Sequence, residues 1–135
     1  MNGGYIFSVE MKVRDYECDL QGVVNNANYQ HYMEHARHEY LESIGGNFQI
    51  LHDKGIDLMV SRVEIDYKRS LKSGDRFRVD LGFERKGARL IFRQDIHRVE
   101  DDALIAAGKI HVVTVKDGML TRGEEFAMIL GEAAK

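Results

Sequence analysis

The spacing of apolar residues switches from a strand period to a helix period and back, and this restricts the fold more than any other feature. Residues 5–14 alternate between apolar and polar side chains, which predicts a half-buried strand. From about Asn25 a helical stripe begins, and "IGG" at 44–46 predicts its end, because glycine tolerates the left-handed conformation. Apolar residues recur there at steps of three and four: Tyr29, Tyr32, Met33, Ala36, Tyr40 and Ile44.

After Gly55 the chain returns to alternation and keeps it. Turn signals separate successive strands: "SGD" at 73–75, "RKG" at 85–87 and "KDG" at 116–118. Residues 103–115 are largely apolar on both faces, which indicates a central strand. We expect a short helix or loop at 47–55 and a short helix in the C-terminal tail. One face of the first strand after Gly55 is predicted to carry Met59, Ser61, Val63, Ile65 and Tyr67.

The order of strand, long helix and strands predicts the α+β class. We expect one curved antiparallel sheet wrapped around one long central helix, in a single domain spanning residues 1–135. A half-sheet around one helix leaves an edge and a face open, so we expect at least a homodimer.

Composition excludes several classes of partner. With 44% hydrophobic and 30% charged residues the chain can bury a core, and its formal charge of −3 argues against nucleic acid or a membrane surface as a partner. No apolar run approaches the roughly 18 to 20 residues of a membrane span, and no secretory signal is expected. The single cysteine, Cys18, forms no internal disulfide, so we expect a cytoplasmic protein.

The residues just before the long helix suggest chemistry. The first N–H groups of that helix, near Asn25 and Asn26, lack intrahelical partners and lie at the positive end of the helix dipole. Such an end can stabilise a carbonyl oxygen that gains negative charge during acyl transfer. The Asp19 carboxylate lies a few residues upstream and can act as nucleophile or as base for water. Gly22 allows the connecting backbone to turn sharply. Asp19 has a simpler interpretation as a helix cap or a solvated loop residue.

The segment "DYECDLQGVVNNANYQHYMEHAR" resembles the signature of the 4-hydroxybenzoyl-CoA thioesterase family of hotdog-fold acyl-CoA thioesterases. Its first acidic position is Glu17 here, and "YKRSLKSGDRFRVD" is similar to the strand–turn–strand segment of the family. The matching residues are Asp19, Gly22, Val23, Val24, Asn28 and Tyr29.

The resemblance implies a hotdog fold and roles for particular residues. Asp19 matches the catalytic carboxylate, and the backbone N–H of Asn26 matches the donor that polarises the thioester carbonyl. Many relatives carry His or Tyr where this chain has Asn26, and the backbone donor is kept with any of these residues. Substrate-binding roles fall to Gly22, Val24, Asn25 and Tyr29.

A basic cluster follows at the turn near residue 87. Relatives use such a cluster to hold the phosphates of coenzyme A, so the resemblance assigns this role to Arg85, Lys86 and Arg89. A surface turn rich in Arg and Lys also has a simpler interpretation, which is solubility.

Other titratable residues are interpreted as structural. His31, His35 and His38 share one helix face, but they point away from the apolar stripe, so we expect a solvated or subunit-facing stripe and no metal site. Glu34 and Glu39 are expected to be surface charges, and Cys18 is expected to be a small filler.

The predicted function is therefore a cytoplasmic acyl-CoA thioesterase that needs no cofactor. It would act as a homodimer or homotetramer, with Asp19 and the helix start supplied by different subunits. Two alternatives remain: a dehydratase acting on a hydroxyacyl thioester, and a non-catalytic acyl-CoA binding protein. The sequence leaves open which acyl group is preferred, and whether it is carried by coenzyme A or by a carrier protein.

Overall fold

The structure is a computed structural model that describes residues 4–45 and 48–130. Its elements follow the predicted order of strand, long helix and strands. They are β1 (Phe7–Lys12), η2 (Asp15–Glu17), α1 (Asn26–Ser43), α2 (Phe48–Asp53), β2 (Ile56–Tyr67), β3 (Arg76–Lys86), β4 (Arg89–Arg98), β5 (Leu104–Lys116), β6 (Met119–Leu120) and α3 (Glu125–Leu130).

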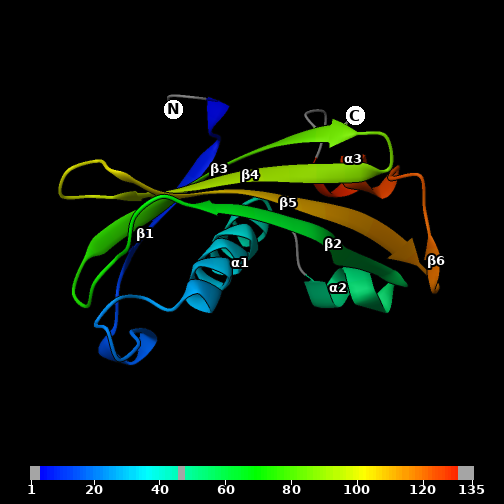
Figure 1. The fold of residues 1–135 in the computed structure, drawn as a ribbon. Helices are drawn as coiled ribbons and strands as arrows, with labels where there is room; N and C mark the ends of the chain where they lie inside the picture. The colour runs from blue at the N-terminus through cyan, green and yellow to red at the C-terminus, as the bar shows by residue number, and fades with distance from the viewer. Residues whose placement is uncertain (1–3, 46–47, 131–135) are drawn as a thin grey trace.

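The strands form one antiparallel sheet in the order β1-β3-β4-β5-β2, with the short β6 pairing with β5. Figure 1 shows this sheet curving over α1, while α2 and α3 lie near the end of the sheet where β2 begins and β5 ends. β5 is paired on both sides, as predicted for a central strand. β2 is an edge strand, because within the described residues it pairs only with β5.

Helix α1 buries the predicted stripe against the concave face of the sheet. Tyr29, Tyr32, Met33, Ala36 and Tyr40 are all buried. Ile44 was also assigned to this stripe, and that prediction is wrong. It is the C-cap residue and is 42% exposed, because the helical phase ends at Ser43.

Gly108 on β5 sets how closely α1 approaches the sheet. A Cβ atom at this position would come within 2.7 Å of the Met33 sulfur. The missing side chain therefore lets the thioether of α1 rest on the strand itself, in line with the close packing of protein interiors.

The prediction for the faces of β2 is wrong in its first half. The register to β5 shifts between Val60 and Arg62. A bulge adds one residue to the strand and so reverses which face the following side chains occupy. Val60 and Val63 consequently share the concave face, and Met59 lies on the convex one. Ser61 is the extra residue of the bulge.

The predicted turns and short helices are largely confirmed. Asp117 and Gly118, with φ angles of 51° and 83°, connect the paired residues Lys116 and Met119. Gly45 has a φ of 83° directly after α1. The segment at 47–55 contains α2, and the tail helix is α3; residues 46, 47 and 131–135 lie outside the described part. Together the layers form the hotdog arrangement that the resemblance implies.

Candidate active site

Asp19 lies in a tight hairpin between η2 and α1. Cys18 and Val24 form the bridge that closes it. The Asp19 N–H donates to the Val23 carbonyl oxygen at 2.9 Å, and the Gly22 N–H donates to the Asp19 carbonyl oxygen at 3.0 Å. Gly22 has a φ of 80°, a conformation that other residues adopt only with strain. The sequence prediction of a sharp turn at this glycine is confirmed.

The Asp19 carboxylate is exposed at the tip of this hairpin. Its Oδ1 accepts a hydrogen bond from the Gln21 N–H at 2.8 Å. Among the described residues no other donor contacts the carboxylate, so Oδ2 is open to solvent or substrate. The carboxylate is therefore oriented by the backbone and is not engaged by a cation of its own chain.

Helix α1 starts next to this hairpin and offers one unpaired N–H. Asn25 is the N-cap, and its Oδ1 accepts from the Ala27 N–H at 2.9 Å. The Asn28 N–H donates to the Asn25 carbonyl oxygen at 2.9 Å. Within the described part of the chain, the Asn26 N–H has no acceptor. The donor predicted from the sequence is thus available, whereas the Asn25 side chain is occupied as a cap.

The carbonyl oxygen of Glu17 ties the hairpin to the helix. It accepts from the Asn25 N–H at 3.1 Å and from the Asn28 Nδ2 at 2.9 Å. One chain therefore holds Asp19 and Asn26 in the same local structure. Asp19 and the helix start are predicted from the sequence to come from different subunits, but a single chain already places them together.

Val24 and Tyr29, both expected to bind substrate, are buried supports of this region. Their exposures are 3% and 2%. The Val24 N–H donates to the Leu71 carbonyl oxygen at 2.9 Å, and the Tyr29 hydroxyl accepts from the Leu71 N–H at 3.0 Å. Burial raises the pKa of Tyr29. Both residues anchor the β2–β3 connection against the start of α1.

Glu17 is a buried carboxylate beneath the hairpin. Its Oε1 accepts from the Arg14 N–H at 2.8 Å, and its Oε2 pairs with the Arg14 guanidinium at 3.1 Å. Burial alone would raise the pKa of Glu17, but the bonds from Arg14 outweigh it and hold that pKa below its usual value. Burial and then the neighbouring Glu17 raise the pKa of Tyr32.

A groove of about 610 Å³ opens beside these residues, between β1 and α1. Its walls carry both aromatic and cationic side chains, among them Lys12, Arg14, Tyr16, Tyr32 and His35. The groove includes Asn28 and therefore reaches the first turn of α1.

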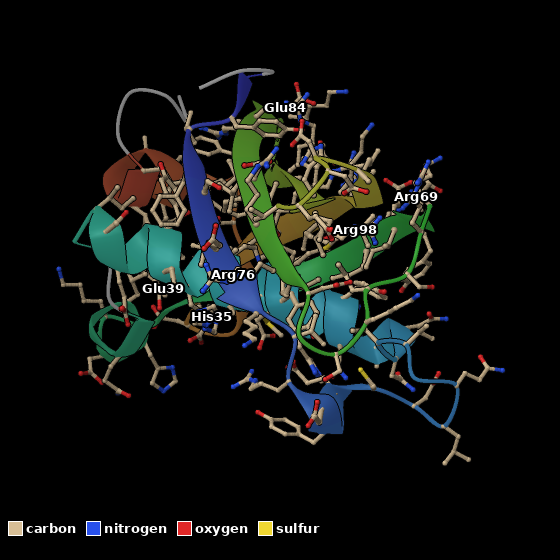
Figure 2. All side chains as sticks on the ribbon, turned by 90° about the vertical axis from the view of Figure 1, so that its left-hand side faces the viewer. His35, Glu39, Arg69, Arg76, Glu84 and Arg98 are labelled. Carbon is tan, nitrogen blue, oxygen red and sulfur yellow. The ribbon has the colours of Figure 1, made fainter. Side chains whose placement is uncertain are left out.

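The basic cluster lies far from Asp19 within one chain. The isolated bridge between Val23 and Lys72 places the hairpin at the start of β3, whereas Arg85 and Lys86 lie at its end. Eleven residues of β3 span about 35 Å, and Figure 2 shows Arg76 and Glu84 at opposite ends of this strand.

The cluster is also held by its own surroundings. Arg85 donates to the carbonyl oxygens of Gly87 and Arg122 at 3.0 and 2.9 Å. Arg89 lies 3.5 Å from the Nδ1 of His111. A single chain does not bring this cluster to the candidate site.

The exposure of the remaining titratable residues of α1 is largely as predicted. His31, His35 and His38 are exposed, and the described residues contain no group of three metal-ligating side chains. Figure 2 shows His35 and Glu39 on the outer flank of the helix, where the His35 Nε2 lies 3.6 Å from a Glu39 carboxylate oxygen. Glu34 is exposed as well.

Sequence reasoning missed a buried polar pair, Arg37 and Gln94. The Arg37 Nη1 donates to the Gln94 Oε1 at 2.8 Å, and both side chains are buried. The hydrophobic periodicity of the sequence pointed to the burial of both residues. Arg37 follows Met33 by four residues in the apolar stripe, and Gln94 lies in phase with the apolar residues Phe92 and Ile96.

No helix among the described residues is both long and apolar enough to cross a membrane.

Comparison with known proteins decides the family. The model of the thioesterase-like superfamily matches residues 13–126. The chain belongs to the thioesterase-like superfamily. It is 33% identical to acyl-CoA thioesterase YbgC of Haemophilus influenzae, over 73% of this chain and 72% of that protein.

A plant relative and a solved structure extend the comparison. Acyl-acyl carrier protein thioesterase ATL3 of Arabidopsis thaliana, a chloroplast protein, is 41% identical over 75% of this chain and 54% of its own length. The chain thus spans about half the length of that relative. The crystal structure of Slr0204, a 1,4-dihydroxy-2-naphthoyl-CoA thioesterase from Synechocystis, superposes with a TM-score of 0.84 at 21% identity, covering 96% of this chain and 98% of that one. This likeness confirms the hotdog fold.

Proposed function

We propose that this chain hydrolyses an acyl-CoA thioester to a carboxylic acid and free coenzyme A. The observation that carries the proposal is the pairing of an exposed, backbone-oriented carboxylate, Asp19, with the unpaired N–H of Asn26. Both groups belong to one hairpin–helix junction. Membership of the thioesterase-like superfamily supports the same reaction.

The reaction follows from the roles of these two groups. The thioester carbonyl oxygen accepts a hydrogen bond from the Asn26 N–H, which stabilises the negative charge that develops there. Asp19 either removes a proton from the attacking water or attacks the carbonyl carbon itself to form an anhydride, which water then cleaves. In both routes the carbon–sulfur bond breaks, and the sulfur leaves as the thiol of coenzyme A.

The proposal includes a homodimer or a dimer of dimers in the cytoplasm. The basic cluster of Arg85, Lys86 and Arg89 stays a predicted phosphate site. Because it lies at the far end of β3, it would serve the Asp19 site of another subunit. An extended phosphopantetheine arm would then cross from the hairpin of one chain to the basic turn of its neighbour.

The deciding experiment measures thiol release with an Asp19→Asn variant. We expect kcat to fall by at least about 100-fold, because a general base contributes about 10²- to 10⁴-fold. The far-ultraviolet circular dichroism and melting temperature should be unchanged, since the carboxylate is exposed. Asp117→Asn, which alters a carboxylate in the β5–β6 turn, is the matched control.

Activity of Asp19→Asn within a few-fold of the parent would remove Asp19 from the mechanism. Binding of acyl-CoA without any turnover by the parent chain would instead favour a non-catalytic binding protein. The same assay with acyl-CoA and with an acyl carrier protein thioester distinguishes the two carriers, which the names of the relatives leave open.

A further inference from the structure

Arg37 places a positive charge inside the protein with no carboxylate in direct contact among the described residues. The Glu34 carboxylate favours this charge only through a longer-range interaction. Arg37 is 8% exposed, and within residues 4–45 and 48–130 it forms no ion pair. Its one hydrogen bond goes to Gln94, whose Nε2 in turn donates to the Met33 carbonyl oxygen at 2.7 Å. A guanidinium has five N–H donors, so most of its hydrogen-bonding capacity remains for another acceptor.

The guanidinium lines a small cavity of about 140 Å³ between α1 and β2. Most of the other walls are apolar, and exposed Glu34 and His38 also line the cavity. The apolar residues are Leu41, Leu58, Val60, Phe92 and Val112. Burial lowers the pKa of Arg37 to about 10, which leaves it cationic at neutral pH. A buried cation in apolar surroundings is costly unless it finds an acceptor, and a carboxylate fits its planar fork best.

Apolar side chains of β2 lie between this cavity and the start of α1. The Tyr67 hydroxyl donates to the Asn26 carbonyl oxygen at 3.3 Å, so the end of β2 meets the first turn of the helix. From there Tyr67, Val63 and Val60 follow the concave side of β2 towards the cavity. They are 47%, 37% and 48% exposed, which is high for the inner face of a sheet.

We propose that Arg37, oriented by Gln94, selects acyl groups that carry an oxygen acceptor at their distal end, such as a carboxylate or a hydroxyl. This inference rests on the proposed thioester hydrolysis at Asn26. Arg37 follows Asn26 by eleven positions, which corresponds to about 16 Å along the helix. The arginine side chain leans back towards the helix N-terminus, which shortens the gap. An extended alkyl chain advances about 1.25 Å per bond, so an acyl chain of about twelve carbons spans about 14 Å and bridges the shortened gap.

The test compares three thioesters of equal length: dodecanoyl-CoA, ω-hydroxydodecanoyl-CoA and the mono-CoA thioester of dodecanedioic acid. We expect kcat/KM to be at least about tenfold higher for the oxygenated acyl groups, because a buried donor site rejects analogues that lack the acceptor. Arg37→Met should reduce this ratio to near one while retaining activity on dodecanoyl-CoA. Arg37→Lys should keep part of the preference, since it keeps the charge.

Arg62→Met is the matched control, because it removes an exposed arginine on the convex face of β2. An unchanged ratio in Arg37→Met, or no preference in the parent protein, would overturn the proposal. The ratio of kcat/KM values in the parent protein is measured without any variant. It therefore tests the proposal even if Arg37→Met folds poorly.

Two further measurements distinguish this proposal from the proposed hydrolysis and from pairing of Arg37 with a second copy of the chain. Calorimetric binding of free dodecanedioate and dodecanoate requires no hydrolysis. Arg37-dependent binding of dodecanedioate would support the proposal even if no thioester were cleaved, a result that would count against the proposed function alone. If Arg37→Met converted a dimer into monomers, a carboxylate of a second copy would account for the charge, and the proposal would fail.

Discussion

Glu17 is the residue on which the geometry of the hairpin most depends. Its carboxylate is held by the Arg14 backbone and guanidinium, while its carbonyl oxygen binds the start of α1. One residue thus links η2, the hairpin and the helix. The buried Tyr32 hydroxyl, which has no normal hydrogen bond among the described residues, lies close enough for Glu17 to raise the Tyr32 pKa further than burial alone does. Ionised Glu17 therefore stabilises the folded state.

Glu17→Gln should reduce the loss of unfolding free energy that the protein shows as the pH falls. The pKa of Glu17 lies below the usual 4.5 in the folded state, so folding favours its ionised form. This contribution is fully present above the unfolded-state pKa and is lost as the pH falls through the folded-state pKa. Urea unfolding at about pH 7 and about pH 3.5 should show a smaller difference in unfolding free energy for the variant.

Exposed Glu124 provides the control for this prediction. Glu124→Gln should keep the acid dependence of the parent protein. Equal acid dependence in the parent and in Glu17→Gln would show that the Arg14 contacts contribute nothing to stability.

At the scale of elements, the start of α1 combines a satisfied cap with one free donor. The Asn25 side chain and carbonyl oxygen take up the N–H groups of Ala27 and Asn28, which leaves the Asn26 N–H alone pointing out of the helix end. A cap that satisfies its neighbours fixes the direction of the remaining donor. In the proposed reaction, Asn25 would therefore act through the backbone that it positions.

Asn25→Ala should destabilise the protein by about 1 kcal/mol, the usual loss when a capping side chain is removed. Asn25→Ser should recover most of this loss, because a serine hydroxyl can accept the same N–H. Denaturant unfolding provides the measurement. An alanine variant as stable as the parent would mean that the hydrogen bond to Ala27 is dispensable.

The order and type of the elements follow from the sequence because each has a clear hydrophobic period. Two features escape this reasoning. The bulge at Ser61 reverses the faces of β2, and no residue type marks a bulge in an alternating segment. Arg37 lies in phase with the apolar stripe, but an arginine is rarely buried without a polar partner, and its partner Gln94 lies far away in sequence. In the same way, the hairpin at Asp19 was predictable from local residues, whereas its distance from the basic cluster depends on sheet topology.

At the scale of the whole molecule, β2 is the unfinished edge of the sheet. Twelve residues of this strand leave one row of backbone groups unpaired within the described chain, and apolar side chains lie exposed on both faces. Long exposed edges of this kind invite pairing with another strand. We expect two copies of the chain to join along β2 and form one continuous sheet.

Met59→Lys should weaken this association. Met59 is 53% exposed on the convex face of β2, so a lysine there fits the free chain but places like charges close together across a symmetric edge. Sedimentation velocity should show a dimer for the parent and a larger monomer fraction for the variant. Met119→Lys changes a methionine that is 72% exposed on β6 and should leave the association unaltered. A parent protein that sediments as a monomer would contradict the prediction.

The contact between Gly108 and Met33 has a consequence for how such chains diverge. The glycine leaves room for the end of the Met33 side chain against β5. A larger residue there would displace the Met33 thioether and reshape the space along the flank of α1. Descendants of this chain could thus come to accept molecules of another shape through a single codon, while Asp19 and Asn26 stay as they are.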